Sequence, residues 1–231
     1  MITLKNVTKK YQGRLVVNNF SLTLESGRII GLLGSNGSGK STTLKMIAGL
    51  VQPTSGSILI NNEKLSRRSC RDIAYLSEHD TLYPFFTVIQ IVQFYASQFK
   101  DFSIDKAIEI LQFLNVNPSD KVKHLSKGSK GRVKIALTLA RKAPFLLMDE
   151  PLSGLDPMVR ESILKGLISF LDIENQTLII STHEVNEVEF ILDSVILIKN
   201  GNLIDFIDVD TLREREGKSV LEWMKQNFTN C

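Results

Sequence analysis

The chain has 231 residues, of which 43% are hydrophobic and 23% are charged. Its 28 basic and 25 acidic residues give a formal net charge of +3, and such a near balance lacks the clustered basic excess of a nucleic-acid-binding protein. Because single hydrophobic cores stop growing near about 250–300 residues, we expect one compact unit and no nucleic-acid partner.

The sequence also argues against a membrane span and against secretion. Its apolar runs have the length of a strand, well short of the roughly 18 residues that span a bilayer. The N-terminus shows no charged segment followed by an apolar one, and Cys70 and Cys231 stand in no metal-binding or redox spacing. We expect a reduced, cytoplasmic protein whose membrane role, if any, passes through a partner.

Residues 2–25 carry apolar side chains at the spacing of two strands, with Gln12 and Gly13 as a turn between them. This pattern predicts an antiparallel β layer. Tyr11 lies at the end of the first strand, where an exposed aromatic ring could stack on a flat base. Half-buried packing is the simpler interpretation of this tyrosine when it is taken alone.

Residues 34–42, Gly-Ser-Asn-Gly-Ser-Gly-Lys-Ser-Thr, fit the phosphate-loop pattern G-x-x-x-x-G-K-[ST] and follow a short apolar strand over 28–33. The glycines allow several backbone N–H groups to turn toward one anion. Lys40 can reach the β- and γ-phosphates, and the Ser41 hydroxyl suits Mg²⁺. A helix over 42–50 adds a favourable N-terminal dipole, so the segment predicts a nucleoside triphosphate site.

Strands are predicted over 57–60 and 73–76, and Glu78 follows the second one, where α/β sheets place ligand-facing residues. Two amphipathic patterns, over 87–99 and 103–114, then predict a helical subdomain. The aromatic residues of 83–86 are a candidate patch for a partner, because Pro84 breaks the periodicity there. Packing in the subdomain core is the alternative role for these aromatic residues.

Residues 125–132 combine small residues with two lysines and an arginine ahead of a helical run over 133–142. Such a helix start could bind a phosphate.

A second chemical centre follows an apolar strand over 145–149, which delivers Asp149 and Glu150 at its C-terminal end. Asp149 would hold Mg²⁺ through water, and Glu150 could polarise the water that attacks the γ-phosphate. A further buried strand over 177–182 places His183 at the same sheet edge. Roles as helix or strand caps remain open for all three residues.

The last part of the chain contains simpler signals. Asp156 and Pro157 are a predicted N-cap and first helical position. A hairpin is predicted for 194–199 and 202–207, about Asn200 and Gly201. The residues from 210 onward indicate a C-terminal helical tail with a solvated charged face.

Five motifs occur in a fixed order: the phosphate loop, Leu-Ser-x-Gly at 125–128, a strand ending in Asp-Glu-Pro, Ser-Gly-Leu-Asp at 153–156, and a strand-end histidine. Together they resemble the ATP-binding cassette (ABC) ATPases, the nucleotide-binding subunits of ABC transporters. The resemblance covers residues 1–207. It implies an α/β phosphate-loop NTPase core with a parallel sheet, an N-terminal antiparallel β layer, a helical subdomain at about 79–143, and a tail over 208–231.

The resemblance also implies roles for individual residues. Glu150 would be the catalytic base, His183 the γ-phosphate switch, and Asp156 the aspartate of an inter-subunit loop. Mg²⁺ would be held by Ser41, Asp149 and Glu78. ATP would be bound by Tyr11 at the adenine; by Ser35, Asn36, Gly37, Ser38, Gly39, Lys40, Ser41 and Thr42 at the phosphates; and by Ser126, Lys127 and Gly128 of the opposite subunit.

The sequence departs from the family pattern at three positions. Glu78 stands where glutamine is usual, and Lys127 and Ser129 stand where glycine and glutamine are most frequent. A carboxylate at 78 can still ligate Mg²⁺, but it adds negative charge beside a triphosphate. Lys127 carries the opposite charge and could compensate across a dimer interface.

A single cassette with a short tail resembles a bacterial exporter subunit that moves drugs, antimicrobial peptides or amphipathic peptides. The implied partners are a polytopic membrane subunit and a second, identical or different, ATPase subunit, which would place the protein at the inner face of the membrane. Three alternatives remain: a soluble ABC ATPase of DNA repair or translation, a module that binds ATP without turnover, and a small phosphate-loop kinase.

Overall fold

The structure is a computed structural model that describes residues 1–66 and 69–229. Of the two cysteines from which the sequence predicts a reduced protein, Cys231 lies outside the described residues, as does the side chain of Cys70. Within the described ranges, no helix is long and apolar enough to cross a bilayer.

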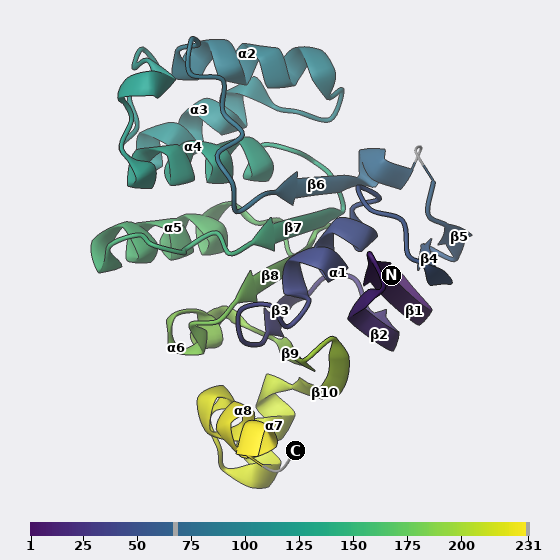
Figure 1. The fold of residues 1–231 in the computed structure, drawn as a ribbon. Coiled ribbons are helices and arrows are strands. Elements are labelled where there is room, and N and C mark those ends of the chain that lie inside the picture. The colour runs from purple at the N-terminus through teal and green to yellow at the C-terminus, as the bar shows by residue number, and fades with distance from the viewer. Residues whose placement is uncertain (67–68, 230–231) are drawn as a thin grey trace.

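A six-stranded sheet forms the centre of the molecule (Figure 1). Its strands lie in the order β10 (Asn202–Asp208), β9 (Ser194–Lys199), β3 (Ile29–Leu33), β8 (Thr177–Thr182), β7 (Phe145–Asp149) and β6 (Ile73–Leu76). Neighbouring strands are parallel, except that β9 and β10 form the predicted antiparallel hairpin about Asn200 and Gly201.

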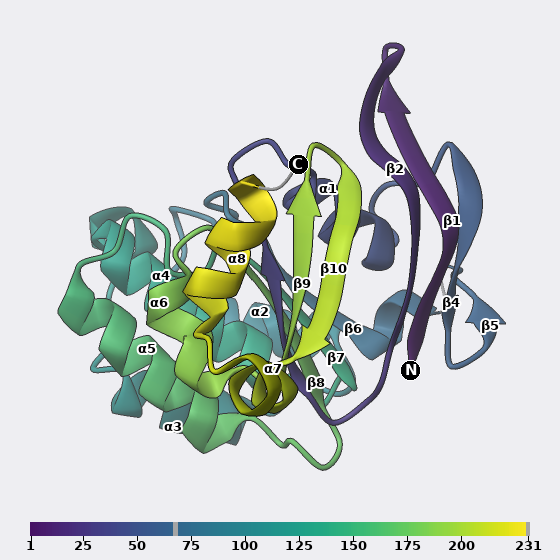
Figure 2. The same ribbon diagram turned by 90° about the horizontal axis from the view of Figure 1, so that it is seen from below.

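A second, antiparallel sheet matches the predicted N-terminal β layer. It contains β2 (Arg14–Leu24), β1 (Ile2–Tyr11), β4 (Ser55–Ile60) and β5 (Glu63–Lys64), in that order. Gln12 and Gly13 make the turn between β1 and β2, both with positive φ. Figure 2 shows β1 and β2 as a long ribbon beside the β9–β10 hairpin, where Asn18 Nδ2 donates a hydrogen bond to Asn202 Oδ1 at 2.9 Å.

The larger sheet is buried on both faces, and alternate residues of one strand belong to different cores. In β3, Ile30 and Leu32 pack in a core with helix α1 (Lys40–Ile47) and the antiparallel sheet. Ile29 and Leu33 pack in a second core with the remaining helices. An apolar run without polar alternation is therefore typical of a parallel strand that is covered on both sides.

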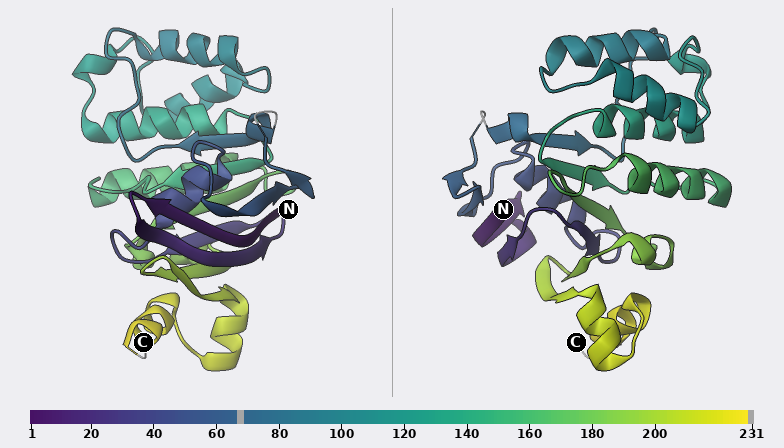
Figure 3. Two further views of the ribbon diagram at one scale, coloured as in Figure 1. Left: turned by 45° about the vertical axis from the view of Figure 1, so that its right-hand side comes forward. Right: turned by 180° about the vertical axis from the view of Figure 1, so that it is seen from behind.

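The helices that surround this second core have mostly the predicted positions. Near β6 lie α2 (Val88–Gln98), α3 (Ile104–Phe113) and α4 (Lys127–Leu139), followed along the sheet by α5 (Pro157–Phe170) and the short α6 (Val185–Val188) (Figures 1 and 3). Thr87 and Asp156 cap α2 and α5 by accepting hydrogen bonds from the backbone N–H groups of Gln90 and Val159. Such caps satisfy donors that the first helical turn leaves unpaired.

Two helices, α1 and α4, have bounds that differ from the sequence prediction. Helix α1 covers 40–47 and not 42–50, so its first turn includes part of the phosphate loop. Helix α4 begins at Lys127 and not at 133, because the Ser126 hydroxyl accepts a hydrogen bond from the backbone N–H of Ser129 at 3.1 Å. The glycines and serines of this segment disfavour a helix by propensity, but the N-cap and the packing of the later turns outweigh that effect.

The C-terminal helices α7 (Val209–Glu216) and α8 (Val220–Thr229) pack against the rest of the molecule (Figure 3). The sequence predicts a solvated face here, but α8 also has a buried face. Trp223 is only 2% exposed and belongs to the same core as β9 and α6. The backbone N–H of Val220 donates to Glu189 Oε1 at 3.0 Å, which fixes the start of α8.

Replacing Trp223 by alanine should lower the free energy of unfolding by about 3 kcal/mol, because the change removes a buried aromatic side chain and leaves a cavity. Urea denaturation followed by circular dichroism measures this loss. Phe190→Ala is the matched control, since Phe190 is 63% exposed, and it should change stability by less than about 0.5 kcal/mol. Equal effects of the two substitutions would show that α8 adds no stability to the core.

Candidate functional site

Four parallel strands of the larger sheet end at the same edge. Leu33 of β3 pairs with Thr182 of β8, Asp149 of β7 pairs with Ser181, and Leu76 of β6 pairs with Met148. The segments that follow these strands therefore meet at one place. They bring together the phosphate loop, Glu78, Glu150 and His183, at the edge where α/β sheets bind ligands.

The phosphate loop connects β3 to α1 and approaches other parts of the backbone closely. Gly39 has φ +110, and a Cβ at this position would lie 2.8 Å from the carbonyl oxygen of Val16. A Cβ at Gly34 would lie 2.4 Å from the carbonyl oxygen of Ile198. Glycine is required at both positions, because any side chain would collide with backbone.

The Lys40 ammonium lies inside this loop and is only 5% exposed. Its Nζ donates to the carbonyl oxygens of Gly34 at 2.8 Å and Ser35 at 3.3 Å. The same atom forms an ion pair with Glu150 Oε1 at 3.1 Å, and the Glu150 side chain is 8% exposed. Lysine and carboxylate therefore compensate each other's buried charge, as a buried ion pair must.

A second cluster surrounds Asp149, which is 1% exposed. Its Oδ1 accepts hydrogen bonds from the hydroxyls of Ser41 and Ser181, each at 2.9 Å. Its Oδ2 accepts one from the Tyr75 hydroxyl at 3.1 Å. Burial and then the charge of Asp149 raise the pKa of Tyr75 above its usual value, so this hydroxyl stays protonated and remains a donor.

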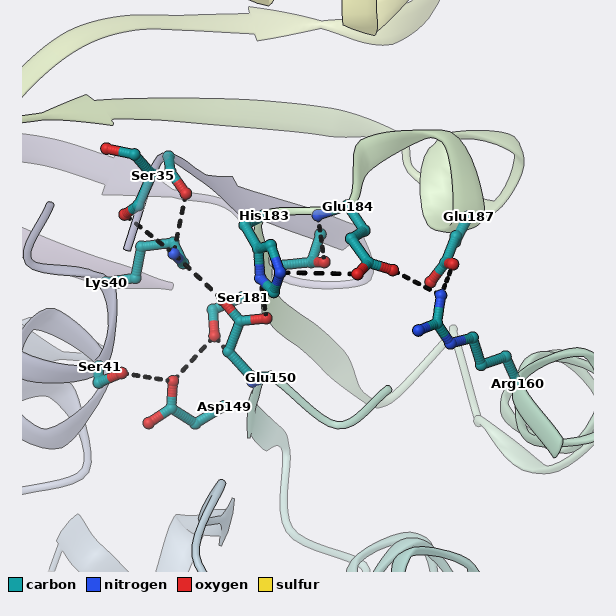
Figure 4. A network of polar contacts seen from close by, with 12 residues as sticks. Ser35, Lys40, Ser41, Asp149, Glu150, Arg160, Ser181, His183, Glu184 and Glu187 are labelled. Carbon is teal, nitrogen blue, oxygen red and sulfur yellow. Dashed lines mark hydrogen bonds and ion pairs between the residues drawn. The ribbon is translucent and has the colours of Figure 1, made fainter. Parts of the chain in front are cut away.

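Glu150 connects the contacts of Lys40 with the cluster around Asp149 (Figure 4). Its backbone N–H donates to Ser181 Oγ at 3.0 Å, and its Oε2 lies 2.9 Å from His183 Nδ1. Its φ of 47° is unusual for a residue other than glycine. The carboxylate is thus held in one place by lysine on one side and by imidazole on the other.

The polar network continues from His183 away from the phosphate loop (Figure 4). His183 Nε2 lies 3.6 Å from Glu184 Oε1, and Glu184 Oε2 pairs with Arg160 at 2.5 Å. Arg160 also pairs with Glu187 and donates to the carbonyl oxygen of Leu155 at 2.7 Å. The loop at 153–156 is therefore connected to the histidine through charged side chains.

A cavity of about 300 Å³ lies between the phosphate loop, Glu78, Glu150 and His183. It is lined by Val16, Asn36, Gly37, Gly39, Lys40, Ser41, Thr42, Glu78, Glu150, Ser153 and His183. Two observations fit an anionic ligand here. No side chain of the described residues caps α1, so its first N–H groups are suited to an anion. The buried hydroxyl of Ser38 also has no hydrogen-bond partner within the described part of the chain.

The same residues fit Mg²⁺ only if it is bound together with a triphosphate. No group of three or more His, Cys, Asp or Glu side chains in the described ranges could hold a metal. Ser41 and Asp149 supply a hydroxyl and one carboxylate, and Glu78 lines the cavity. Mg²⁺ is commonly held by one or two carboxylates with phosphate oxygens and water.

Some predicted site residues lie outside the cavity lining. Tyr11 is 43% exposed, and its ring faces the Lys9 ammonium at 4.9 Å. Ser35 contributes its carbonyl oxygen to Lys40. At the start of α4, the N-cap Ser126 and Lys127 are exposed and Gly128 is half-buried. Lys127 lines a neighbouring cavity of about 420 Å³.

Four residues of this network are not predicted from the sequence: Ser181, Tyr75, Arg160 and Glu184. Only Ser181 has a position in the sequence that indicates a role in the site. It is the penultimate residue of β8, the strand that His183 follows directly. The other three become part of the site only through tertiary contacts.

Ser181→Ala should lower kcat for the expected ATP hydrolysis by about 10-fold. The change removes the hydroxyl that orients Asp149 and accepts a hydrogen bond from the backbone N–H of Glu150. It should also lower the free energy of unfolding by roughly 1–3 kcal/mol, since two buried groups lose a partner. Phosphate release and urea denaturation measure the two effects. Ser162→Ala is the control, because Ser162 Oγ donates only to Val159 O one turn back. A Ser181→Ala protein with the properties of the control would contradict this role.

Comparison with known proteins gives a consistent result. The family model described as ABC transporter matches residues 17–153. The chain is 35% identical over 220 residues to the ABC transporter ATP-binding protein YcbN of Bacillus subtilis, covering 92% of this chain and 71% of that protein. It is 33% identical over 206 residues to the lantibiotic transport ATP-binding protein SrtF of Streptococcus pyogenes, covering 88% and 89%.

A solved structure matches the fold. The dimeric, post-hydrolysis ATP-binding cassette MJ0796 bound to ADP and Pi has a TM-score of 0.80 and 28% identity. The match covers 90% of this chain and 98% of the cassette.

Proposed function

The chain belongs to the ABC transporter family and is its ATP-binding, ATP-hydrolysing subunit, and on this premise we propose that it powers export of a drug, an antimicrobial peptide or an amphipathic peptide through a separate membrane subunit. The similarity to a lantibiotic transport protein supports this substrate class. The observation that carries the hydrolytic role is the contact of Glu150 with both Lys40 and His183 beside the phosphate loop.

We assign the residues as follows. Glu150 accepts a proton from the attacking water, and His183 holds the carboxylate in place through its Nδ1 contact. Lys40 exchanges its Glu150 partner for the triphosphate, which leaves the carboxylate available as a base. Ser41, Glu78 and Asp149 would hold Mg²⁺ together with the triphosphate. Bound Mg²⁺ supplies charge neutralisation on the phosphates.

The catalytic unit is a head-to-tail dimer of identical or different ATPase subunits. Ser126, Lys127 and Gly128 at the start of α4 provide small side chains and a cation to the γ-phosphate in the opposite subunit. Tyr11 stacks on the adenine. Residues 1–207 form the ATPase domain with its helical subdomain at 79–143, and 208–231 form the tail.

The surface around residues 83–95 is the proposed contact with the membrane subunit, which holds the protein at the inner face of the membrane. Phe85 is 68% exposed and Tyr83 is 45% exposed. Tyr83 contacts Phe86 and Phe94 edge to face, at ring-centroid distances of 5.8 and 5.6 Å. An adjacent cavity of about 400 Å³ has a mostly apolar and aromatic lining, which consists of Thr81, Leu82, Tyr83, Ile91, Phe94, Tyr95, Gln98 and Phe99. Exposed aromatic groups of this kind are enriched at protein interfaces.

A photo-crosslinking residue placed at Phe85 should capture a polytopic membrane protein in cells, because that side chain is the most exposed aromatic of the patch. The control is the same residue at Phe206, which is 38% exposed and lies on β10. Mass spectrometry identifies the adducts. Adducts only from Phe206, or only with soluble proteins, would contradict the proposed contact and would favour a non-transport ATPase.

A further inference from the structure

The segment 77–80, which connects β6 to the helical subdomain, is held by lysines of α4, and one of them contacts three of its four residues. Lys134 Nζ donates to the carbonyl oxygens of Ser77 at 2.7 Å, Glu78 at 3.2 Å and His79 at 3.0 Å. An ammonium has three donors and no acceptor. All three donors of Lys134 are therefore used on three consecutive residues of one loop.

A second lysine strengthens the same contact one helical turn earlier. Lys130 Nζ pairs with Asp80 Oδ2 at 2.7 Å. Burial would raise the pKa of the Asp80 carboxyl, but hydrogen bonds from Lys130 and from the Leu82 backbone outweigh it, so the pKa is lowered. Positions i and i+4 lie on one face of a helix. One face of α4 thus binds the whole of segment 77–80.

Lys134 does not line the nucleotide cavity, whereas Glu78 does. Lys134 lies in the neighbouring cavity, which Glu78 also lines. Burial lowers the pKa of Lys134, while the carboxylates of Asp80 and Glu78 act in the opposite direction. Lys134 is therefore held beside the backbone of Glu78 and lies outside the nucleotide cavity.

Glu78 and the start of α4 contribute to two different nucleotide sites of the proposed dimer. Glu78 lines the cavity beside the phosphate loop of its own subunit. Helix α4 begins at the Ser126–Gly128 segment, which serves the nucleotide of the opposite subunit in the proposed dimer. An α-helix transmits displacement along its axis because its backbone hydrogen bonds keep it stiff. A loop fixed to α4 must move with the start of α4.

We propose that Lys134 is a positioning residue that fixes Glu78 to α4, so that Glu78 and the Ser126–Gly128 segment take up their working positions together. The proposal rests on the metal role of Glu78 given above. Lys134 then controls kcat and the Mg²⁺ requirement, and it leaves the affinity of the phosphate loop for ATP unchanged. A lysine that only stabilised the helix would change the stability without changing the Mg²⁺ requirement.

The first test measures the anchor directly in nucleotide-free protein. Hydrogen–deuterium exchange should be about 10-fold faster at 77–82 in Lys134→Met, because the loop loses its three hydrogen bonds. Exchange in the phosphate loop at 34–42 should stay unchanged. Lys165→Met is the matched control, since Lys165 lies on α5 and, among the described residues, forms its ion pair with the exposed Glu161. Unchanged exchange at 77–82 in Lys134→Met would overturn the proposal.

The second test is a double-mutant cycle with Glu78. Lys134→Met should lower kcat by about 10-fold and raise the Mg²⁺ concentration for half-maximal rate, with KM for ATP changed by less than about 2-fold. Lys134→Arg should restore most of the rate, because the guanidinium also donates to several carbonyl oxygens. In the Glu78→Ala background, Lys134→Met should add less than about 2-fold, since the lysine acts through Glu78.

The outcomes separate this proposal from the proposed metal role. Glu78→Ala with wild-type kcat and Mg²⁺ dependence would refute the role of Glu78 itself, and with it the role of Lys134. An impaired Glu78→Ala together with a fully active Lys134→Met would refute the positioning role alone. Independent, additive losses from the two substitutions would also overturn it.

Discussion

Lys40→Ala should lose at least about 100-fold in affinity for ATP, because the ammonium forms charge-assisted hydrogen bonds with the phosphates that backbone N–H groups cannot replace. Titration calorimetry with Mg²⁺ present measures the loss. Lys45→Ala is the control, because Lys45 lies on the same helix but does not line the cavity. An affinity for ATP equal to that of the wild type would show that Lys40 does not bind the phosphates.

The structure adds a second consequence of this substitution, which the sequence does not reveal. Without Lys40, the buried carboxylate of Glu150 loses the cation that lies 3.1 Å from its Oε1. Removing one partner of a buried ion pair costs about 3–5 kcal/mol. Adding Glu150→Gln to Lys40→Ala should therefore recover part of the lost stability in urea denaturation. A double variant that is no more stable than Lys40→Ala would show that the ion pair contributes little to the free energy of unfolding.

Glu150→Gln should lower kcat by about 1,000-fold and leave ATP binding in place, since the amide keeps the shape of the carboxylate but cannot accept a proton from water. Single-turnover phosphate release and nucleotide binding measure the two properties separately. Glu174→Gln, an exposed position in the loop before β8, is the control. A Glu150→Gln protein that hydrolyses ATP at the wild-type rate would exclude Glu150 as the base.

The sequence predicts the phosphate loop and the strands of the site well, because local patterns determine these elements. A glycine pattern determines the loop at 34–39, and buried apolar runs determine β3, β7 and β8. Once those strands are parallel, their C-terminal ends must meet at one edge. Asp149, Glu150 and His183 follow from this topology without any knowledge of side-chain contacts.

The remaining details depend on tertiary contacts that have no local pattern. Tyr75 and Ser181 resemble ordinary strand residues until β6, β7 and β8 lie side by side around Asp149. Lys134 has the appearance of a solvated helical lysine, and only the fold places three carbonyl oxygens around its ammonium. Trp223 lies within the predicted charged tail, and only the fold shows that its side chain packs against segments distant in sequence.

The dimer mechanism requires that ATP bridge two subunits, and Glu150→Gln makes this association measurable because ATP stays bound. Gel filtration with light scattering at high protein concentration should show twice the mass of one chain with Mg-ATP, and the mass of one chain with ADP. A ligand that contacts both surfaces stabilises only the closed state. Ser126→Glu in the same background should restore the single-chain mass, because its charge opposes the γ-phosphate. A Glu150→Gln protein that binds Mg-ATP and remains a monomer would contradict the mechanism.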